Sequence, residues 1–357
     1  MSSILYYVTG HGYGHAVRSS EVIRALKEIR PDLQVYVRTT APRWLFPETV
    51  SYSRRSIDVG MVQRDSLDID FDATLQKCRT LLSDASRLIT EELAYIRDHA
   101  VGLIVGDIPA LAFAIASGAG IPSAAVTNFT WTGIYRPFAE ALPEFRTVAG
   151  QMARFYADAT VGLALPYSLG LDIFPRNEPI AWIARKSALD QKTAREQFGL
   201  PDPAKVVLLS FGGLGLQRLP LKKLKRMRDF VFVVSAGEKR IDDNIFFVSG
   251  TQYRYEDLVR AADVIVTKPG YGIAADAISH RVPVLYTDRG DFPEYPHLVR
   301  ALHDCATAEF IPQRQLLAGN IGSYLTQLLE KEQHWPAVEL NGAQIAAEKL
   351  LELLGKA

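Results

Sequence analysis

The sequence contains little cysteine, no excess of either charge and no long apolar run. Only Cys78 and Cys305 occur, without metal-like spacing, so neither a disulfide framework nor a zinc module is indicated. The 40 basic and 40 acidic residues balance, which argues against a general nucleic-acid binder because that function needs a strong positive field. No apolar run reaches the ~18 residues that span a bilayer.

The chain is long enough for two domains. Its 357 residues exceed the roughly 250–300 residues at which single hydrophobic cores stop growing. A hydrophobic fraction of 48% is ordinary for a folded protein. The opening residues run directly into Ile4–Val8 without a basic segment or a cleavage site, so we expect a first strand rather than a signal peptide. A reducing, cytoplasmic location is the simplest expectation.

Short apolar runs alternate with amphipathic stretches along the chain. Runs rich in Val, Ile and Leu between helical patterns are typical of parallel strands that are buried on both faces. We therefore expect an α/β fold with two Rossmann-like, doubly wound domains. The predicted strands are Ile4–Val8, Leu33–Val37, Leu103–Val105, Ala124–Val126 and Val161–Leu165, then Val206–Leu209, Phe230–Val234, Ile245–Val248, Val264–Val266 and Val284–Tyr286. The predicted helices include Ser19–Ile29, Ala73–Asp98, Ser187–Phe198 and Ala274–His280.

The boundary between the domains is expected where prolines interrupt this pattern. Pro166, Pro175 and Pro179 separate the two sets of strands, and proline disrupts both helices and central strands. The resulting division is a first domain at 1–170, a linker and the start of the second domain at 171–200, and a second domain at 201–340. A C-terminal helix within 341–357 could pack back on the first domain.

Four predicted strand ends carry unusual residues, and doubly wound sheets bind ligands at such ends. The first segment, Thr9–His15, places three glycines and two histidines before a helix that should begin near Val17. Glycines allow a close approach of the backbone to a ligand, and a helix start offers free N–H groups and a positive dipole end. The alternative is a tight turn in which the histidines are incidental.

His15 is the sharper candidate for a general base, because the positive end of a helix dipole favours neutral imidazole. His11 could be a polar contact, a turn residue or the base itself. Asp107 follows the strand Leu103–Val105 and could accept a hydrogen bond from a histidine on a neighbouring strand end, which would fix the histidine tautomer. Asp107 could equally N-cap a helix at Ala110–Ser117.

The other two strand ends lie in the second half of the chain. Gly212 and Gly213 follow Val206–Leu209 and suit a turn that passes close to a ligand. Lys268–Gly272 connects a buried strand to a helix, an arrangement that favours diphosphate binding. Asp276 lies one turn beyond Gly272, hence on the same helix face, where it could accept hydrogen bonds from ribose hydroxyls or could be an ordinary surface residue.

In combination these motifs resemble the GT-B glycosyltransferases, including the UDP-glycosyltransferases and the N-acetylglucosaminyltransferase that makes lipid II. The Gly14-His15 pair, Asp107 after a buried strand, and a glycine-bounded turn followed by Asp276 carry that resemblance. A closer resemblance is to the glycosyltransferase-like amino-terminal half of plant arabinokinases and their bacterial relatives. It is carried by Tyr6–Arg18, Asp58–Gln63 with Asp65 and Asp70, Thr127–Trp131 and Gly270–Gly272. No kinase-type glycine loop follows, so kinase activity is not predicted.

The resemblance implies inverting, metal-independent transfer of a sugar from a nucleoside-diphosphate sugar, preferably a UDP-sugar, to a hydroxyl acceptor. His15 would be the base and Asp107 its support. The implied donor-binding residues are Gly212, Gly213, Gly270, Tyr271, Gly272, Asp276, Asp291 and Glu294, and the acceptor side or cleft would include His11, Gly14 and Asn128. Asp68, Asp70 and Asp72 resemble a DxD metal motif but are interpreted as polar residues before a helix. No Asp-Gln pair accompanies Asp291 and Glu294, which leaves the identity of the sugar open.

Other functions remain open at this stage. The chain could be a catalytically silent nucleotide-sugar-binding module, or a GT-B sugar-nucleotide epimerase, for which no clear pair of acid and base carboxylates is present. The basic stretch Leu221–Arg228 and the cluster Trp44–Phe46 would suit a weak peripheral membrane contact. A solvated basic helix and a buried loop anchor are the simpler interpretation. Tyr253 and Tyr255 are expected to be core or rim aromatics rather than nucleobase contacts.

Overall fold

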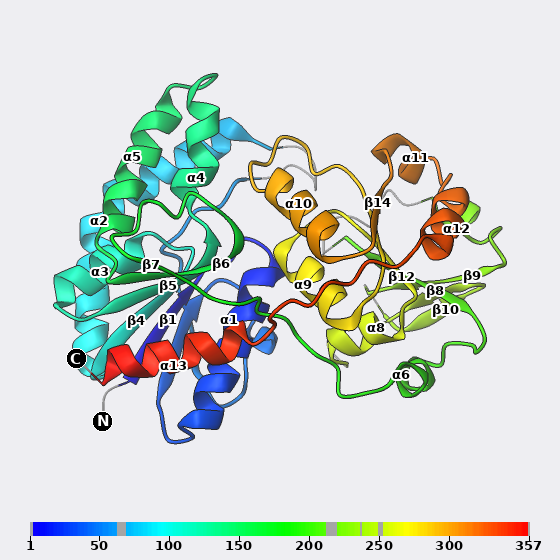
Figure 1. The fold of residues 1–357 in the computed structure, drawn as a ribbon. Coiled ribbons are helices and arrows are strands. Elements are labelled where there is room, and N and C mark those ends of the chain that lie inside the picture. The colour runs from blue at the N-terminus through cyan, green and yellow to red at the C-terminus, as the bar shows by residue number, and fades with distance from the viewer. Residues whose placement is uncertain (1–2, 63–68, 212–219, 236–237, 249–252, 356–357) are drawn as a thin grey trace.

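Two seven-stranded sheets, each flanked by helices, make up the protein (Figure 1). The computed structural model describes residues 3–62, 69–211, 220–235, 238–248 and 253–355. All strand pairs are parallel except the pairing of β10 with β11. Each sheet separates two hydrophobic clusters, one on each face. The prediction of an α/β fold with two doubly wound sheets is confirmed.

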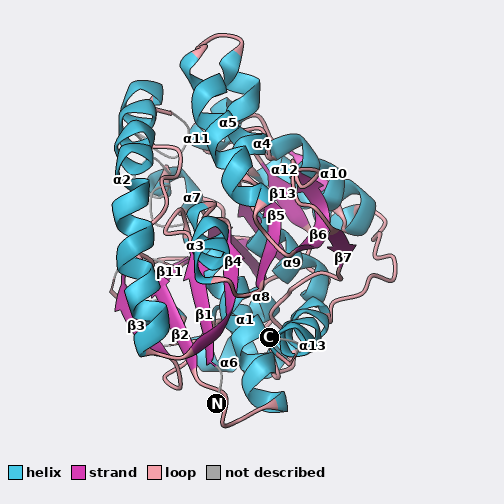
Figure 2. Cartoon of the chain, turned by 90° about the vertical axis from the view of Figure 1, so that its left-hand side faces the viewer, coloured by secondary structure: helices cyan, strands magenta, loops and turns pink. Residues whose placement is uncertain are grey.

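The first sheet has the order β3-β2-β1-β4-β5-β6-β7, which can be followed across Figure 2. Chain order reverses between β1 and β4, so the ends of these two neighbours form the switch point at which such sheets bind ligands. Val8 at the end of β1 pairs with Asp107 at the end of β4. The strands are β1 Ser3–Val8, β2 Val35–Thr39, β3 Ser51–Arg54, β4 Val101–Asp107, β5 Ser123–Phe129, β6 Val161–Leu169 and β7 Asn177–Pro179.

Helices from both ends of the chain cover the first sheet. The last helix, α13, returns from the second domain and packs against α1, as the red helix in Figure 1 shows. The first sheet also runs as far as Pro179 in β7, nine residues past the expected boundary at 170. The helical segments are α1 Tyr13–Ile29, η1 Arg43–Leu45, α2 Phe71–Asp98, α3 Leu111–Ala119, α4 Trp131–Tyr135, η2 Arg136–Ala139, α5 Glu144–Ala157 and α13 Gly342–Leu354.

The second sheet has the order β10-β11-β9-β8-β12-β13-β14, with its switch point between β8 and β12. The strands are β8 Lys205–Ser210, β9 Phe230–Val234, β10 Arg240–Asp242, β11 Ile245–Phe247, β12 Val264–Thr267, β13 Val284–Tyr286 and β14 Ala308–Phe310. The helices are α6 Gln191–Phe198, α7 Leu221–Leu224, α8 Tyr255–Ala261, α9 Tyr271–His280, α10 Tyr295–Cys305, α11 Gln313–Leu317 and α12 Gly322–Glu330. Within the described ranges, none of the helices combines the length and the apolar composition that a membrane crossing requires.

The interpretation of Leu221–Arg228 as one basic helix is wrong. Helix α7 ends at Leu224, and Lys225 and Arg228 instead pair with Asp242 and Asp243. These two ion pairs direct Lys225 and Arg228 to the neighbouring β-hairpin. In the predicted apolar cluster, Trp44 is 52% exposed whereas Phe46 is buried.

A buried carboxylate fixes helix α2 to the first sheet. Glu92 on α2 is fully buried and accepts a hydrogen bond from Tyr7 Oη of β1 at 2.5 Å. Its oxygens also lie 3.0 Å from Arg38 Nε of β2 and 2.7 Å from Arg55 Nε, just after β3. A buried charge of this kind is tolerated because Tyr7 Oη and Arg38 Nη2 donate hydrogen bonds to it and both arginines offset its charge. Glu92 therefore sets the distance between α2 and the strand ends.

We predict that Glu92→Ala lowers the free energy of unfolding by about 3–5 kcal/mol, because it leaves two arginines without their buried partner. Urea denaturation followed by circular dichroism measures this loss. The matched control is Glu91→Ala, since the exposed Glu91 pairs with Arg55 and Arg87 at the surface and surface pairs contribute little. Equal effects of the two substitutions would contradict the anchoring role of Glu92.

Candidate active site

The loop between β1 and α1 places the start of α1, which contains His15, at the switch point. Helix α1 begins at Tyr13 rather than near Val17, so His15 lies in the first helical turn. The preceding residue, Gly12, has φ +83°, a conformation that residues with a Cβ rarely adopt. Glycine at this position therefore allows the chain to turn sharply from the end of β1 into α1.

Asp107 is the centre of the polar contacts at the switch point. Its carboxylate accepts hydrogen bonds from Arg18 Nε at 2.8 Å, from Arg18 Nη2 at 2.6 Å and from Ser19 Oγ at 2.9 Å. His15 Nδ1 lies 3.1 Å from the same carboxylate. The N-cap position of α3 is Ala110, which makes no side-chain cap. The alternative interpretation of Asp107 as a helix cap is therefore wrong.

These contacts fix the protonation of the cluster. Burial acts to raise the pKa of Asp107, but the charge and hydrogen bonds of Arg18, with a smaller contribution from His15, outweigh it and hold the pKa at about 2. Burial and the nearby Arg18 lower the pKa of His15, although Asp107 opposes the shift. At neutral pH the pair is thus an aspartate and a neutral imidazole.

Two neighbours compete for His15 Nδ1, and their competition decides which ring nitrogen is free. Arg18 Nη2 lies 2.9 Å from Nδ1 and Asp107 lies 3.1 Å from it. A carboxylate is the stronger acceptor for the arginine proton because the hydrogen bond is charge-assisted. This preference leaves Nδ1–H to donate to Asp107 and puts the lone pair on Nε2, which is the arrangement that a general base requires.

A chain of hydrogen bonds continues from Arg18 into the second domain. Arg18 Nη1 donates to the Asn128 side chain, and Asn128 Nδ2 donates to Glu294 Oε1 at 2.6 Å. The other oxygen of Glu294 accepts from Arg289 Nη1 at 2.7 Å. Asn128 is the penultimate residue of strand β5, and Glu294 precedes α10. The predicted cleft residue Asn128 therefore links the His15–Asp107 pair to the loop that was expected to meet the donor sugar.

The starts of helices α1 and α9 meet at two glycines. A Cβ built on Gly272 would lie 3.6 Å from Gly14 Cα, and both glycines have no side chain to separate the helices. The free N–H groups and positive dipole ends of α1 and α9 therefore approach one another. Gly270 is the N-cap residue of α9. This is the arrangement that an anionic group between the two domains would stabilise.

Tyr271 packs at the interface between the domains, and its role in donor binding stays a prediction. Its side chain is buried and stacks on Trp182 with ring centroids 4.9 Å apart. The Arg18 guanidinium carbon lies 5.2 Å from the centroid of the same ring. The side chain of Tyr271 therefore docks α9 onto the first domain, because its position on the helix faces the domain interface.

Asp276 is buried, with 2% exposure, and its carboxylate is held by Arg185. The Arg185 backbone N and side-chain Nε each lie 3.3 Å from Asp276 Oδ1, and Nη2 donates to Oδ2. Arg185 belongs to the linker between the domains. The alternative that Asp276 is an ordinary surface residue is therefore wrong. Its contact with ribose hydroxyls stays a prediction, and in the structure a linker arginine binds the carboxylate.

The remaining expected donor residues have different surroundings. Asp291 is exposed, whereas Glu294 is buried in its contacts with Asn128 and Arg289. Gly212 and Gly213 lie outside the described residues, as does Asp68 of the DxD-like segment.

Asp70 N-caps helix α2 by accepting from Ala73 N at 3.0 Å, so its interpretation as a residue before a helix is confirmed. In the part of the chain that the structure describes, no three His, Cys, Asp or Glu side chains gather as a metal site.

His11 lies in an aromatic environment next to His15. Its ring stacks on Phe292 of the second domain at 6.3 Å and contacts Trp131 edge-on at 5.4 Å. A Cβ on Gly60 would come within 2.4 Å of His11 Nδ1, so glycine there makes room for the ring. Burial is the main cause that lowers the pKa of His11 to about 3, and electrostatic interactions with His15, Arg289 and Lys268 add to it.

Sequence reasoning missed three arginines that organise the site. Arg18 could have been predicted to lie near His15, because it follows His15 by three residues and therefore lies on the same helix face. Arg185 and Arg289 come from a linker and a loop, where no periodicity indicates the direction of a side chain. Tyr253 and Tyr255 pack against the second core as expected, and Tyr255 Oη is within hydrogen-bond distance of Ser210 Oγ.

Comparison with known proteins agrees with this architecture. Residues 2–146 match the sequence model of glycosyl transferase family 1. An L-arabinokinase of Arabidopsis thaliana is 30% identical over 357 residues, which cover 97% of this chain and 34% of the relative. The chain thus spans about a third of that relative's length. An uncharacterized glycosyltransferase of Methanopyrus kandleri is 25% identical over 254 residues, covering 66% of this chain and 70% of the relative.

The fold is shared with a solved glycosyltransferase. The crystal structure of the kitacinnamycin glycosyltransferase matches with a TM-score of 0.65 and 17% identity, over 99% of this chain and 95% of that chain. The chain therefore has the GT-B fold, and the family match in its first 146 residues supports a glycosyltransferase. The more particular resemblance to arabinokinases is confirmed by an alignment across almost the whole chain.

We predict that His11 remains neutral from pH 5 to pH 8. Because its folded pKa of about 3 lies below the unfolded value of roughly 6.5, the unfolded state takes up the proton first. The contribution of neutral His11 to stability is complete above about pH 6.5 and is lost as the pH falls toward 3. NMR of ¹³Cε1-labelled histidine measures the titration, with His11→Asn to assign the signal. A midpoint near 6.5 would contradict the buried, neutral assignment.

Proposed function

We propose that the protein is an inverting glycosyltransferase that uses a nucleoside-diphosphate sugar, preferably a UDP-sugar, and that His15 is its general base. The observation that carries the proposal is the meeting of two features at the domain interface. His15 with its Asp107 partner lies at the start of α1, and Gly14 beside it contacts Gly272 at the start of α9. A base and a diphosphate-binding helix start therefore face one reaction centre.

In the proposed step, an acceptor hydroxyl oxygen attacks the anomeric carbon of the donor sugar. The new glycosidic bond forms as the bond from that carbon to the diphosphate oxygen breaks, and the configuration inverts. The hydroxyl proton passes to His15 Nε2, and the nucleoside diphosphate leaves with the bonding electron pair. Asp107 supports the step because its hydrogen bond to Nδ1 fixes the tautomer and stabilises the imidazolium.

The charge on the leaving group would be stabilised by the protein itself. The free N–H groups at the start of α9 can bind phosphate oxygens, and the helix dipole adds a positive potential. Lys268 and Arg289 lie close enough to the interface for their charges to lower the pKa of His11. We therefore propose that the reaction requires no metal ion.

A silent nucleotide-sugar-binding module is the second candidate function. The observation that favours it is the pairing of Arg185 with Asp276, together with that of Arg289 with Glu294, because both carboxylates proposed for donor recognition already have partners. A transferase would have to exchange these contacts for the donor hydroxyls during binding. An epimerase is less well supported, since it needs an acid and a base on either side of one sugar carbon.

We predict that His15→Ala lowers the rate of transfer by at least about 100-fold, the usual contribution of a positioned general base, while the protein still binds the nucleotide sugar. The donor is first identified from UDP-, GDP-, ADP- and dTDP-sugars by thermal shift. Transfer and donor hydrolysis are then measured by NMR of the released products, and donor affinity by calorimetry. The matched control is His334→Ala, because His334 is exposed in a loop between α12 and α13.

Three results would separate the candidate functions. Full activity of the His15→Ala variant would contradict the assignment of the base. Stabilisation by a nucleotide sugar without transfer or hydrolysis in the wild type would favour the silent module. An unchanged melting temperature in the presence of every nucleotide sugar would contradict the proposal of donor binding altogether.

A further inference from the structure

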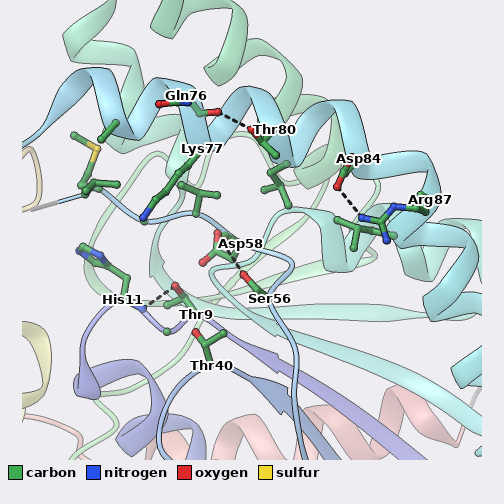
Figure 3. Close-up of a pocket in the computed structure, with 18 residues that line it drawn as sticks. Thr9, His11, Thr40, Ser56, Asp58, Gln76, Lys77, Thr80, Asp84 and Arg87 are labelled. Atoms are coloured by element: carbon green, nitrogen blue, oxygen red, sulfur yellow. Dashed lines mark hydrogen bonds and ion pairs between the residues drawn. The ribbon is translucent and has the colours of Figure 1, made fainter.

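A polar pocket opens in the first domain between helix α2 and the ends of strands β1, β2 and β3 (Figure 3). Its volume is about 750 Å³, enough for a ligand of the size of a sugar or a small glycoside. His11 forms part of its wall. His11 contacts the ring of Trp131, His15 contacts the ring of Phe129, and these two rings contact each other, so this pocket lies near the proposed base. We call it the Asp58 pocket.

Asp58 supplies a buried hydrogen-bond acceptor to this pocket. Its Oδ1 accepts from Trp131 Nε1 at 2.6 Å. Its Oδ2 is a buried atom without a partner in hydrogen-bonding geometry, although the Thr9 hydroxyl and the Val59 backbone N–H lie close enough to the carboxylate to stabilise its charge. A buried carboxylate oxygen without a donor costs free energy. A ligand hydroxyl that donates to Oδ2 would remove this cost.

Helix α2 provides a donor on the opposite wall. Lys77 points from α2 into the pocket in Figure 3, and it makes no hydrogen bond or ion pair with any residue that the structure describes. Its neighbours along the helix behave differently, because Asp84 and Arg87 pair with one another at 2.7 Å. Lys77 is therefore the basic side chain of this wall that can serve a ligand.

The rest of the lining is suited to hydroxyl groups. Thr9, Thr40 and Ser56 bring further hydroxyls to the floor beneath α2, as Figure 3 shows. Hydroxyls both donate and accept, so they adapt to a ligand that does the same. An apolar ligand would leave Asp58 Oδ2 unpaired, and sites that are built around polar groups discriminate strongly against ligands that cannot satisfy them.

We propose that the Asp58 pocket binds the acceptor, and that this acceptor is a small polyhydroxylated molecule of the sugar or polyol class. One hydroxyl donates to Asp58 Oδ2 and a neighbouring hydroxyl accepts from Lys77 Nζ. A third hydroxyl, at the His11 end of the pocket, is the one presented to His15. The inference rests on the proposed glycosyl transfer and adds to it the chemistry of the acceptor.

Acceptor binding tests the inference without relying on turnover. Saturation-transfer NMR is recorded on the wild type with the nucleoside diphosphate present, using free pentoses, hexoses and inositol as probes and 4-nitrophenol as the apolar probe. Binding of at least one polyol, and weak or no binding of 4-nitrophenol, is expected. Binding of 4-nitrophenol alone, or of no probe at concentrations of about 10 mM, would overturn the inference.

Variants then locate the binding. Asp58→Asn, which keeps an oxygen for Trp131, and Lys77→Met should each weaken polyol binding at least tenfold while leaving nucleotide affinity unchanged. Arg87→Met, at the outer end of the same helix wall, is the matched control and should change polyol binding less than twofold. Lys77 is exposed on α2, so Lys77→Met remains informative if Asp58→Asn fails to fold. Unchanged polyol binding in Lys77→Met and in every folded Asp58 variant would exclude this pocket.

The inference and the proposed function can fail separately. If nucleotide sugars bind and are transferred only to apolar alcohols, the glycosyltransferase remains and the acceptor class is wrong. If polyols bind in the Asp58 pocket but no nucleotide sugar is bound, the polyol site stands and the proposed transfer is wrong.

Discussion

The buried contact between Arg18 and Asp107 is the interaction on which the site depends. Two arginine nitrogens bind one carboxylate, so neither charge can move without exposing the other, and breaking such a pair costs about 3–5 kcal/mol. The pair orients His15 on one side. On the other side, Arg18 donates a hydrogen bond to Asn128, which in turn donates to Glu294, and the Arg18 guanidinium lies over the ring of Tyr271. A single guanidinium therefore connects the proposed base to both proposed donor segments of the second domain.

This connection affects how the proposed chemistry proceeds. Arg18 and His15 both contact the Asp107 carboxylate. Burial and the charge of Arg18 lower the pKa of His15, so His15 stays neutral, as a base must be. The same charge makes the imidazolium that forms during the reaction less stable. Both carboxylates that are proposed to bind the donor already form ion pairs within the protein, Asp276 with Arg185 and Glu294 with Arg289. Donor binding then requires an exchange of partners at both carboxylates. Such exchange couples donor recognition to the domain interface in which Tyr271 and Trp182 stack.

Much of this arrangement could be predicted from the residues that directly follow the predicted buried strands. His15 and Asp107 follow buried runs, and parallel strands bring such ends to one edge of a sheet, so their proximity required no knowledge of side-chain packing. Tyr271 and Asp276 were expected to face a ligand, but the direction of a helical side chain depends on where the helix docks. Arg185 and Arg289 come from irregular segments and could not be placed. Strands β3, β7, β10 and β14 are short and lie near or at sheet edges, where the apolar signal is weak.

A crystal structure of the complex with the nucleotide sugar that stabilises the protein most would show directly whether the proposed base and diphosphate site serve one donor. The proposed mechanism predicts diphosphate oxygens within about 3 Å of the backbone N–H groups at the start of α9. It also predicts His15 Nε2 facing the anomeric carbon, with Nδ1 still bound to Asp107. A diphosphate bound away from Gly270–Gly272, or a sugar whose anomeric carbon lies far from His15, would contradict it.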